Sequence, residues 1–136
     1  MILGIGSDIA SIDRIARVLA DHGDRFTQRC FAETERARID QSSDDTARAA
    51  GYAKRWAAKE ACAKALGLGI RDQIFLKDIT VVNDNAGRPS LSLQGGAKQR
   101  LTDLTPQGMT PRIDVSLSDD GGMALAFVVI SAGNAS

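Results

Sequence analysis

The stretch Trp56-Ala57-Ala58-Lys59-Glu60-Ala61-Cys62-Ala63-Lys64-Ala65 decides the fold of this chain more than any other segment. Half of its residues are alanine, the residue with the highest helix propensity. We therefore expect one long helix from about Asp45 to Leu66, which Gly67 and Gly69 bring to an end. Helix propensity alone explains the alanines, but their small size would also let this helix pack closely against a sheet or a neighbouring subunit.

Two residues of this helix carry opposite charges on one face. Glu60 and Lys64 are four positions apart, and such residues are neighbours on a helix surface. A second acid, Asp8, closes the apolar run Met1–Ser7, where we expect a strand to give way to a turn. Two carboxylates and a lysine indicate a site for a divalent metal and a phosphate. Two plainer interpretations stay open: a solvated helix pair for Glu60 and Lys64, and a helix N-cap for Asp8.

Composition limits the classes of protein to consider. The chain has 136 residues, 43% of them hydrophobic, so we expect a single domain, residues 1–136, with one core. Its 17 basic and 17 acidic side chains balance, which argues against nucleic acid or an anionic membrane as a partner. No run approaches the ~20 apolar residues of a membrane span, and no basic leader precedes a long apolar region. We therefore expect a cytoplasmic protein, with Cys30 and Cys62 as reduced, buried thiols.

Hydrophobic periodicity predicts the elements before the long helix. Residues 2–7 are expected to form a strand, and an amphipathic helix then follows with apolar side chains at three- and four-residue steps, namely Ile9, Ile12, Ile15, Val18 and Leu19. Gly23 ends that helix, Asp24 caps a further helical turn, and another short helix starts near Thr34.

After the long helix the period changes to two. Strands are expected on both sides of the turn Asn83–Pro89, residues 95–103 are helical, and two further strands, Arg112–Ser118 and Met123–Ser131, flank a tight turn. Residues 133–136 are expected to fray. This order predicts an α+β fold, with a mostly antiparallel sheet packed against one long helix and shorter helices.

Four segments resemble the small bacterial holo-(acyl-carrier-protein) synthases, a family of 4′-phosphopantetheinyl transferases. The segments are Gly4–Ile9, Arg55–Ala61 with Lys64-Ala65 and Gly67-x-Gly69-Ile70, Asn83–Pro89, and Val115–Ser118. One short motif matches many chains by chance, but four in the same order and spacing do not. The resemblance spans nearly the whole chain. It implies transfer of the phosphopantetheine arm of coenzyme A to a serine of apo acyl carrier protein, for fatty acid biosynthesis, with release of adenosine 3′,5′-bisphosphate.

The resemblance also implies how the reaction is catalysed. Asp8 and Glu60 match the family's ligands for Mg²⁺, for which Mn²⁺ could substitute. Mg²⁺ keeps several waters and needs only one or two protein carboxylates beside phosphate oxygens. Glu60, directly or through a bound water, would accept the serine proton, and Lys64 would stabilise the departing phosphate.

Further residues are assigned to the two substrates through the resemblance. Those for coenzyme A are Arg55, Lys59, Lys64, Gly67, Asn83, Gly87 and Pro89. Those for docking an acidic helix of the carrier protein are Arg14, Arg25, Phe26 and Arg29. From the residues alone, these charges could equally be solvated helix surface, and the glycine–proline turn could be a plain hairpin.

The resemblance implies a homotrimer with active sites at subunit interfaces, where one chain supplies Asp8 and Glu60 and its neighbour supplies the docking arginines. Many relatives carry a histidine directly after the strand that ends at Ser118, whereas this chain has Asp119. No role of that histidine can be transferred, and a turn acid is the plainer interpretation. His22, the sole histidine, precedes a helix-ending glycine and is not expected to be catalytic.

Two other classes of function remain open from the residues alone. A metal-dependent nuclease or nucleotide hydrolase also uses an Asp, a Glu and a nearby Lys, although the chain lacks a basic footprint for nucleic acid. A non-enzymatic assembly module would use the alanine-rich helix only to pack subunits.

Overall fold

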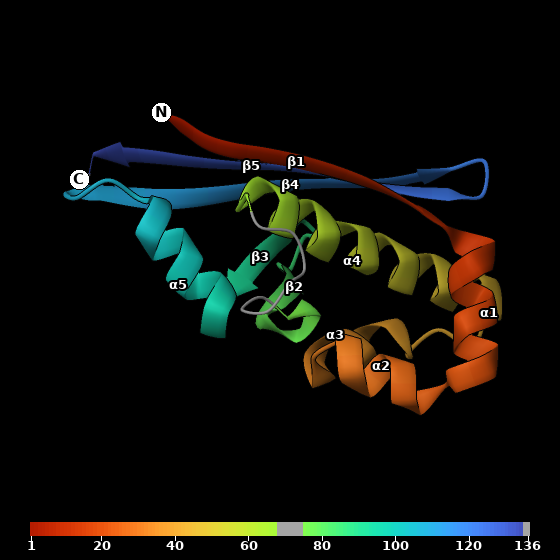
Figure 1. The fold of residues 1–136 in the computed structure, drawn as a ribbon. Coiled ribbons are helices and arrows are strands. Elements are labelled where there is room, and N and C mark those ends of the chain that lie inside the picture. The colour runs from red at the N-terminus through yellow and green to blue at the C-terminus, as the bar shows by residue number, and fades with distance from the viewer. Residues whose placement is uncertain (68–74, 135–136) are drawn as a thin grey trace.

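The computed structural model describes residues 1–67 and 75–134 (Figure 1). Along the chain these form β1 (Ile2–Ser11), α1 (Ile12–His22), α2 (Asp24–Cys30), α3 (Glu33–Ile39), α4 (Asp45–Ala65), a short 3₁₀ turn η1 (Leu76–Asp78), β2 (Ile79–Asn83), β3 (Pro89–Leu93), α5 (Gly95–Leu104), β4 (Met109–Asp120) and β5 (Met123–Asn134). Among the described residues, no helix is both long and apolar enough to cross a bilayer.

An antiparallel sheet with the strand order β1-β5-β4 forms one layer, and the β2–β3 hairpin forms a separate antiparallel pair. The long helix α4 lies against one face of the larger sheet, and α1, α2 and α3 lie on the other side of α4 (Figure 1). The expected α+β architecture is confirmed, including the long helix, whose first turn is capped by the Asp44 side chain on the Thr46 N–H at 3.0 Å.

Burial alternates along β5 as expected for a strand with one face in the core. Ala124, Ala126, Val128 and Ile130 are fully buried under α4. Leu125 and Phe127 point to the opposite face of the sheet, where they are 42% and 45% exposed. The sheet therefore has a buried face under the helix and an apolar face open to solvent.

Two glycines set the spacing between β1 and α4. A Cβ atom on Gly4 would lie 1.9 Å from the Ala65 carbonyl oxygen, and one on Gly6 would lie 2.0 Å from that of Ala61. No other residue fits at such distances, so the backbones of strand and helix are in direct contact. The prediction that the alanine-rich helix packs closely against the sheet is confirmed.

The first strand is longer than expected, and this corrects two assignments. Asp8 lies inside β1, opposite Ala126 of β5, and does not end the strand. Ile9, expected on the first helix, belongs to β1 and is 62% exposed. The N-cap of α1 is Ser11, whose hydroxyl accepts a hydrogen bond from the Arg14 N–H at 3.2 Å, so the N-cap interpretation of Asp8 is wrong.

Other element boundaries also differ from the predicted ones, mainly because strand pairing extends further than the local sequence pattern indicates. β4 and β5 pair along their whole length, from Met109 opposite Asn134 to Asp120 opposite Met123, so residues 133 and 134 are not frayed. Gly23 takes the N-cap position of α2, which the sequence had given to Asp24. Gly69 and residues 135–136 lie outside the described part of the chain.

Candidate active site

The structure brings together the three residues of the predicted metal and phosphate site. The Nζ atom of Lys64 donates to Asp8 Oδ1 at 3.1 Å and to the Ser7 carbonyl oxygen at 3.0 Å. Asp8 and Glu60 line one cavity of about 610 Å³ between β1, α1 and α4. The contact of Gly6 with Ala61 places residue 8 of the strand beside this stretch of the helix.

The two carboxylates repel one another. The pKa of Glu60 is raised above its usual value, first by burial and then by the negative charge of Asp8, while Lys64 lowers it. A cation between the carboxylates would relieve this repulsion.

The donor set fits Mg²⁺. Within residues 1–67 and 75–134, nowhere do three or more His, Cys, Asp or Glu side chains gather as a closed protein cage for a metal. Mg²⁺ does not need such a cage, since one or two carboxylates together with waters and substrate phosphates suffice. Asp8 already binds a cation, because the ammonium of Lys64 occupies its Oδ1 atom. The geometry therefore suits two hard oxygen ligands that face a phosphate.

The predicted docking residues surround the same region. Arg14 of α1 and Phe26 of α2 line the cavity that holds Asp8 and Glu60. Arg25 and Arg29 line a second cavity of about 450 Å³, which shares Phe26 and Trp56 with the first. Within one chain, basic and aromatic side chains thus extend directly from the acid pair.

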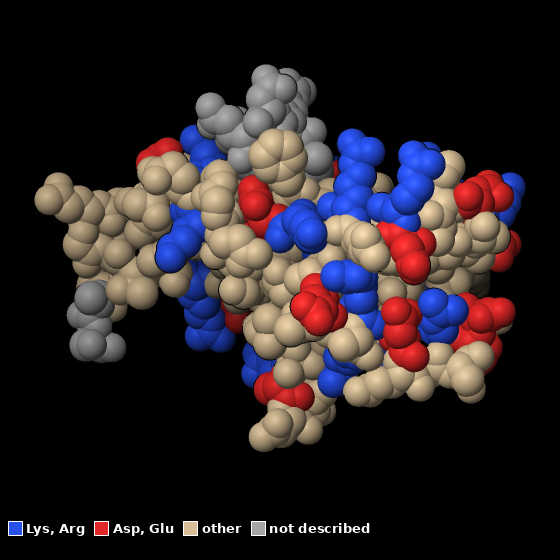
Figure 2. All heavy atoms as spheres, turned by 90° about the horizontal axis from the view of Figure 1, so that it is seen from below, with Lys and Arg blue, Asp and Glu red and all other residues tan. Residues whose placement is uncertain are grey.

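Arg14 lies close to the carboxylates of its own chain, because β1 passes into α1 at Ser11 without a loop. The expectation that a neighbouring chain supplies the docking arginines stays a prediction. In Figure 2 basic and acidic side chains are interspersed on the face that α1, α2 and α3 cover, with no broad basic surface there.

Four residues predicted to contact coenzyme A lie around the β2–β3 hairpin. Arg55 donates through Nη2 to Asn83 Oδ1 at 3.1 Å, and Asn83 donates through Nδ2 to the Gly87 carbonyl oxygen at 3.1 Å. Pro89 is the first residue of β3, and Gly87 has a φ of 87°. None of the four lines the Asp8–Glu60 cavity of the described chain.

Arg55 is almost completely buried. Only 8% of it is exposed, and burial lowers the pKa of its guanidinium. Its Nε atom is buried without a hydrogen bond to any described residue, which leaves one donor of a charged group unsatisfied.

Lys59 is located differently from what the sequence predicted. It is fully buried, and its Nζ atom donates to Glu35 Oε1 at 2.7 Å and to the carbonyl oxygens of Leu76 and Ile79. Burial lowers the pKa of Lys59, and the charge of Glu35 partly offsets this. Three protein acceptors match the three N–H donors of its ammonium, so we propose no phosphate contact for this residue.

The sequence analysis did not identify the partner of Lys59. Glu35 lies in the short helix predicted to start near Thr34, and its carboxylate also accepts hydrogen bonds from the Ala32 N–H at 2.9 Å and the Val81 N–H at 3.1 Å. Glu35 and Lys59 join α3, α4 and β2 inside the core. An acid and a base that are far apart in sequence give no local signal of such a pair.

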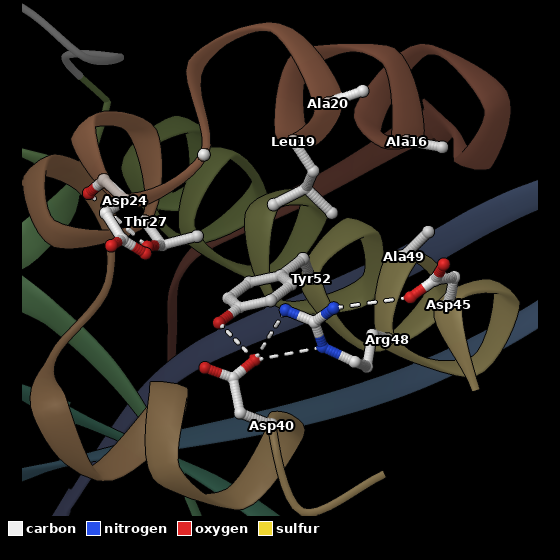
Figure 3. Close-up of a pocket in the computed structure, with 11 residues that line it drawn as sticks. Ala16, Leu19, Ala20, Asp24, Thr27, Asp40, Asp45, Arg48, Ala49 and Tyr52 are labelled. Carbon is white, nitrogen blue, oxygen red and sulfur yellow. Dashed lines mark hydrogen bonds and ion pairs between the residues drawn. The ribbon is translucent and has the colours of Figure 1, made fainter. Parts of the chain in front are cut away.

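The structure contains a polar network that was not predicted from the sequence, beside α1 and α4. Asp40 Oδ1 accepts hydrogen bonds from the Tyr52 hydroxyl at 3.0 Å and from Arg48 at 3.1 and 3.2 Å (Figure 3). These residues line a cavity of about 250 Å³ between α1, α2 and the start of α4. Burial raises the pKa of Tyr52, so this hydroxyl stays protonated and donates to Asp40. The network joins the end of α3 to α4.

Three further residues discussed in the sequence are Asp119, Gly67 and His22. Asp119 at the end of β4 pairs with Lys54 of α4 at 3.1 Å, as a charge between hairpin and helix. Gly67 follows the last turn of α4 with a φ of 84°, and Arg100 Nε donates to the Leu66 carbonyl oxygen at 2.9 Å. His22 is exposed at the end of α1.

Comparison with known proteins gives one consistent result. Residues 4–126 match the family model of the 4′-phosphopantetheinyl transferase superfamily. The chain is 56% identical over 133 residues to a holo-(acyl-carrier-protein) synthase of Rhodopseudomonas palustris strain TIE-1, which covers 97% of this chain and 91% of that relative.

Solved structures agree with this result. The crystal structure of holo-(acyl-carrier-protein) synthase from Neisseria meningitidis superposes with a TM-score of 0.80 at 36% identity, over 96% of this chain and 99% of that one. The Helicobacter pylori enzyme in complex with coenzyme A gives a TM-score of 0.77 at 28% identity, over 93% and 99% of the two chains.

Proposed function

The chain belongs to the holo-(acyl-carrier-protein) synthase family of the 4′-phosphopantetheinyl transferase superfamily, and from this premise we propose how its residues perform the family's reaction. The enzyme transfers the phosphopantetheine arm of coenzyme A to a serine of apo acyl carrier protein and releases adenosine 3′,5′-bisphosphate, a step in fatty acid biosynthesis. One observation carries the assignment of roles: Asp8 and Glu60 line one cavity and Lys64 bonds Asp8, although Asp8 is far from the other two in sequence.

We propose that Asp8 and Glu60 hold Mg²⁺, or Mn²⁺ in its place, together with oxygens of the pyrophosphate. The metal would polarise the phosphoryl group and neutralise the charge that develops on it. Glu60 would also accept the proton of the attacking serine hydroxyl, directly or through a water that it binds. In the metal-free protein, burial and the charge of Asp8 raise the pKa of Glu60, so its carboxylate already takes up a proton more readily than an ordinary Glu.

Lys64 would stabilise the departing phosphate. Its side chain is 53% exposed and starts one helical turn from Glu60, so its ammonium can reach a ligand bound between strand and helix. A positive charge at that position stabilises the bisphosphate leaving group as the bond to phosphorus breaks.

The nucleotide part of coenzyme A requires a second set of contacts. We propose that Arg55, Asn83, Gly87 and Pro89 bind it, with the buried and unsatisfied Nε of Arg55 as a free donor, and that Gly67 gives the phosphates close access to the end of α4. Since the first four residues are not part of the Asp8–Glu60 cavity of the same chain, one coenzyme A would contact both sets most simply across two subunits.

The exposed face of the large sheet supports such an assembly. Ile5 and Ile9 of β1 are 60% and 62% exposed, beside the exposed Leu125 and Phe127 of β5. A contiguous apolar surface of this kind marks an interaction site. We propose a homotrimer with active sites at the subunit interfaces, in which Arg14 nevertheless belongs to the same chain as Asp8 and Glu60.

The carrier protein would dock on α1 and α2. Arg14, Arg25 and Arg29 offer positive charge and Phe26 an apolar contact around the mouth of the two cavities. This arrangement suits an acidic helix next to a serine that must reach Glu60.

We also propose that residues 1–136 form one domain, since one cluster of buried side chains includes members from the large sheet, β2 and all the helices except η1. We propose the cytoplasm as its location.

A transfer assay tests the function directly. The protein is incubated with coenzyme A, MgCl₂ and an apo acyl carrier protein, and the carrier is weighed by mass spectrometry. A mass gain of one phosphopantetheine arm is expected, and it should disappear with EDTA. Hydrolysis of coenzyme A without transfer would instead support a nucleotide hydrolase, and no reaction would support an assembly module.

A further inference from the structure

The ammonium of Lys64 contacts Asp8 at the place where the proposed metal ion would also bring positive charge. The ammonium bonds Asp8 Oδ1, an oxygen of a carboxylate proposed to bind the metal. The side chain of Glu60, the other proposed ligand, makes no hydrogen bond or ion pair with any residue that the structure describes. The positive charge in this carboxylate pair is therefore already provided by a side chain, on the Asp8 side only.

An ammonium and Mg²⁺ cannot share this carboxylate oxygen without cost. Two cations at contact distance repel each other strongly, more so where the surroundings are partly shielded from water. Asp8 is such a partly shielded group, with 19% of its side chain exposed. A metal that binds Asp8 through Oδ1 must therefore displace Lys64, and one that binds through Oδ2 lies close enough to repel its ammonium.

Lys64 is free to leave while staying close. Its side chain is 53% exposed, and its second hydrogen bond is to the Ser7 carbonyl oxygen at 3.0 Å, which is not a proposed metal ligand. The Cα atoms of residues 8 and 64 are held by the backbone contacts of β1 with α4, so release moves the ammonium and not the helix.

We propose that Lys64 is an internal competitor of the metal ion: its ammonium holds Asp8 in the metal-free enzyme, and binding of a divalent cation releases it towards the substrate phosphate. This inference rests on the metal site of the proposed function. Metal binding and release of the lysine are then coupled. The Lys64 ammonium becomes available to assist the leaving group only when the metal is bound. The free enzyme, in return, binds the metal more weakly than its two carboxylates alone would.

Calorimetric titration with MgCl₂ in the absence of coenzyme A tests the competition. Lys64→Met keeps the length and apolar stem of the side chain and removes the charge. Its Mg²⁺ affinity should rise about two- to fivefold, the range that the loss of a partly exposed ion pair gives. Equal or weaker binding than in the wild type would overturn the inference.

Lys54→Met is the matched control. Lys54 lies on the same helix, pairs with Asp119 at 3.1 Å, and carries the same charge, but it does not contact Asp8 or Glu60. Its Mg²⁺ affinity should stay within about 1.5-fold of the wild type, because exposed charges at a distance are screened. An equal increase in both variants would show a general effect of net charge and would contradict direct competition.

Chemical labelling gives a second, independent readout. Lysine acetylation followed by mass spectrometry should show faster modification of Lys64 when MgCl₂ is added, with Lys54 unchanged. Unchanged or slower labelling of Lys64 would count against its release.

The two proposals can fail separately. A wild-type protein that transfers the phosphopantetheine arm yet binds no Mg²⁺ in the absence of coenzyme A would overturn the inference alone. A protein whose Lys64→Met variant binds Mg²⁺ more tightly, but which never modifies a carrier protein, would leave the competition intact and contradict the function.

Discussion

Lys59 and Lys64 both extend from α4 and both pair with a carboxylate, but they do so in opposite surroundings. Lys59 and Glu35 are completely buried, whereas the Lys64 and Asp8 side chains are 53% and 19% exposed. Five positions turn a helix by about 140°, so the same helix directs one lysine into the core and the other to the cavity. The sequence motif that contains both lysines thus places one in the interior and the other at the proposed catalytic site.

The difference has a physical consequence. A buried ion pair is costly to break, because the remaining charge stays without a partner in a medium of low polarity. An exposed pair contributes little to stability, and its members are free to change partners. The first kind of pair holds a structure together, and the second kind can take part in a reaction.

Removing the buried charge should have the largest effect. Lys59→Met leaves the Glu35 carboxylate unpaired in the core and should lower the free energy of unfolding by roughly 3–5 kcal/mol. Urea denaturation followed by circular dichroism measures this. Lys64→Met, the matched variant, should cost less than about 1 kcal/mol. Similar losses in the two variants would show that the comparison between the pairs does not hold.

The exposed site should show the reverse pattern, with loss of activity and intact structure. Glu60→Gln removes a proposed metal ligand that is also the proposed base, so turnover should fall about 10²- to 10³-fold. Rates of carrier modification at saturating MgCl₂ measure the loss, and gel filtration with thermal unfolding checks that assembly and stability are kept. Full activity of the variant would refute both roles of Glu60.

Reversal of a charge at the mouth of the cavity should have a smaller and more selective effect. Arg14→Glu is expected to raise the KM for the carrier protein roughly tenfold, since it places a negative charge against an acidic helix. The KM for coenzyme A should change little. Equal losses for the two substrates would argue that Arg14 supports the site as a whole and does not dock the carrier.

The smallest expected effect is on the pH dependence of stability in the metal-free protein. The pKa of Glu60 is raised on folding, so the folded state binds a proton more tightly than the unfolded state does. Stability should therefore decrease as pH rises from the usual Glu value of 4.5 through the raised pKa, and it should increase as pH falls through the same window.

The measurement compares thermal unfolding of the wild type and of Glu60→Gln across this range. The difference between them should shrink towards low pH, where Glu60 is protonated in the wild type. Saturating MgCl₂ should oppose this proton binding, since a carboxylate must lose its proton to bind a metal. A difference that does not vary with pH would show that Glu60 does not titrate as its surroundings indicate.

The sequence predicted the elements whose signals are local. The helix over Asp45–Leu66 follows from its alanines, and the pairing of Glu60 with Lys64 on one face follows from the period of the helix. Asp8 was grouped with these two residues from its place after an apolar run, and the resemblance of four segments to a known family supported that grouping against the plainer interpretations.

The errors came from contacts between distant parts of the chain. Ile9 fits the helical series of Ile12 and Ile15, but pairing with β5 keeps residue 9 in an extended strand. Its side chain is apolar and exposed on the sheet face that we propose to cover with another subunit, so its hydrophobicity did not mark the core of one chain. Lys59 was predicted to contact coenzyme A, with a solvated helix surface as the alternative, because Glu35 is distant in sequence and a sequence does not show the carbonyl groups that accept from Lys59.

The contact of Gly6 with the carbonyl oxygen of Ala61 has a consequence for how this enzyme can change during evolution. Main-chain atoms alone fix the separation of strand and helix there, so it does not depend on the size of any side chain. A substitution elsewhere in the interior therefore leaves this contact between the strand of Asp8 and the helix of Glu60 in place. A single methyl group added at position 6 would force the strand from the helix and widen the gap between the two acids in a protein that is otherwise folded.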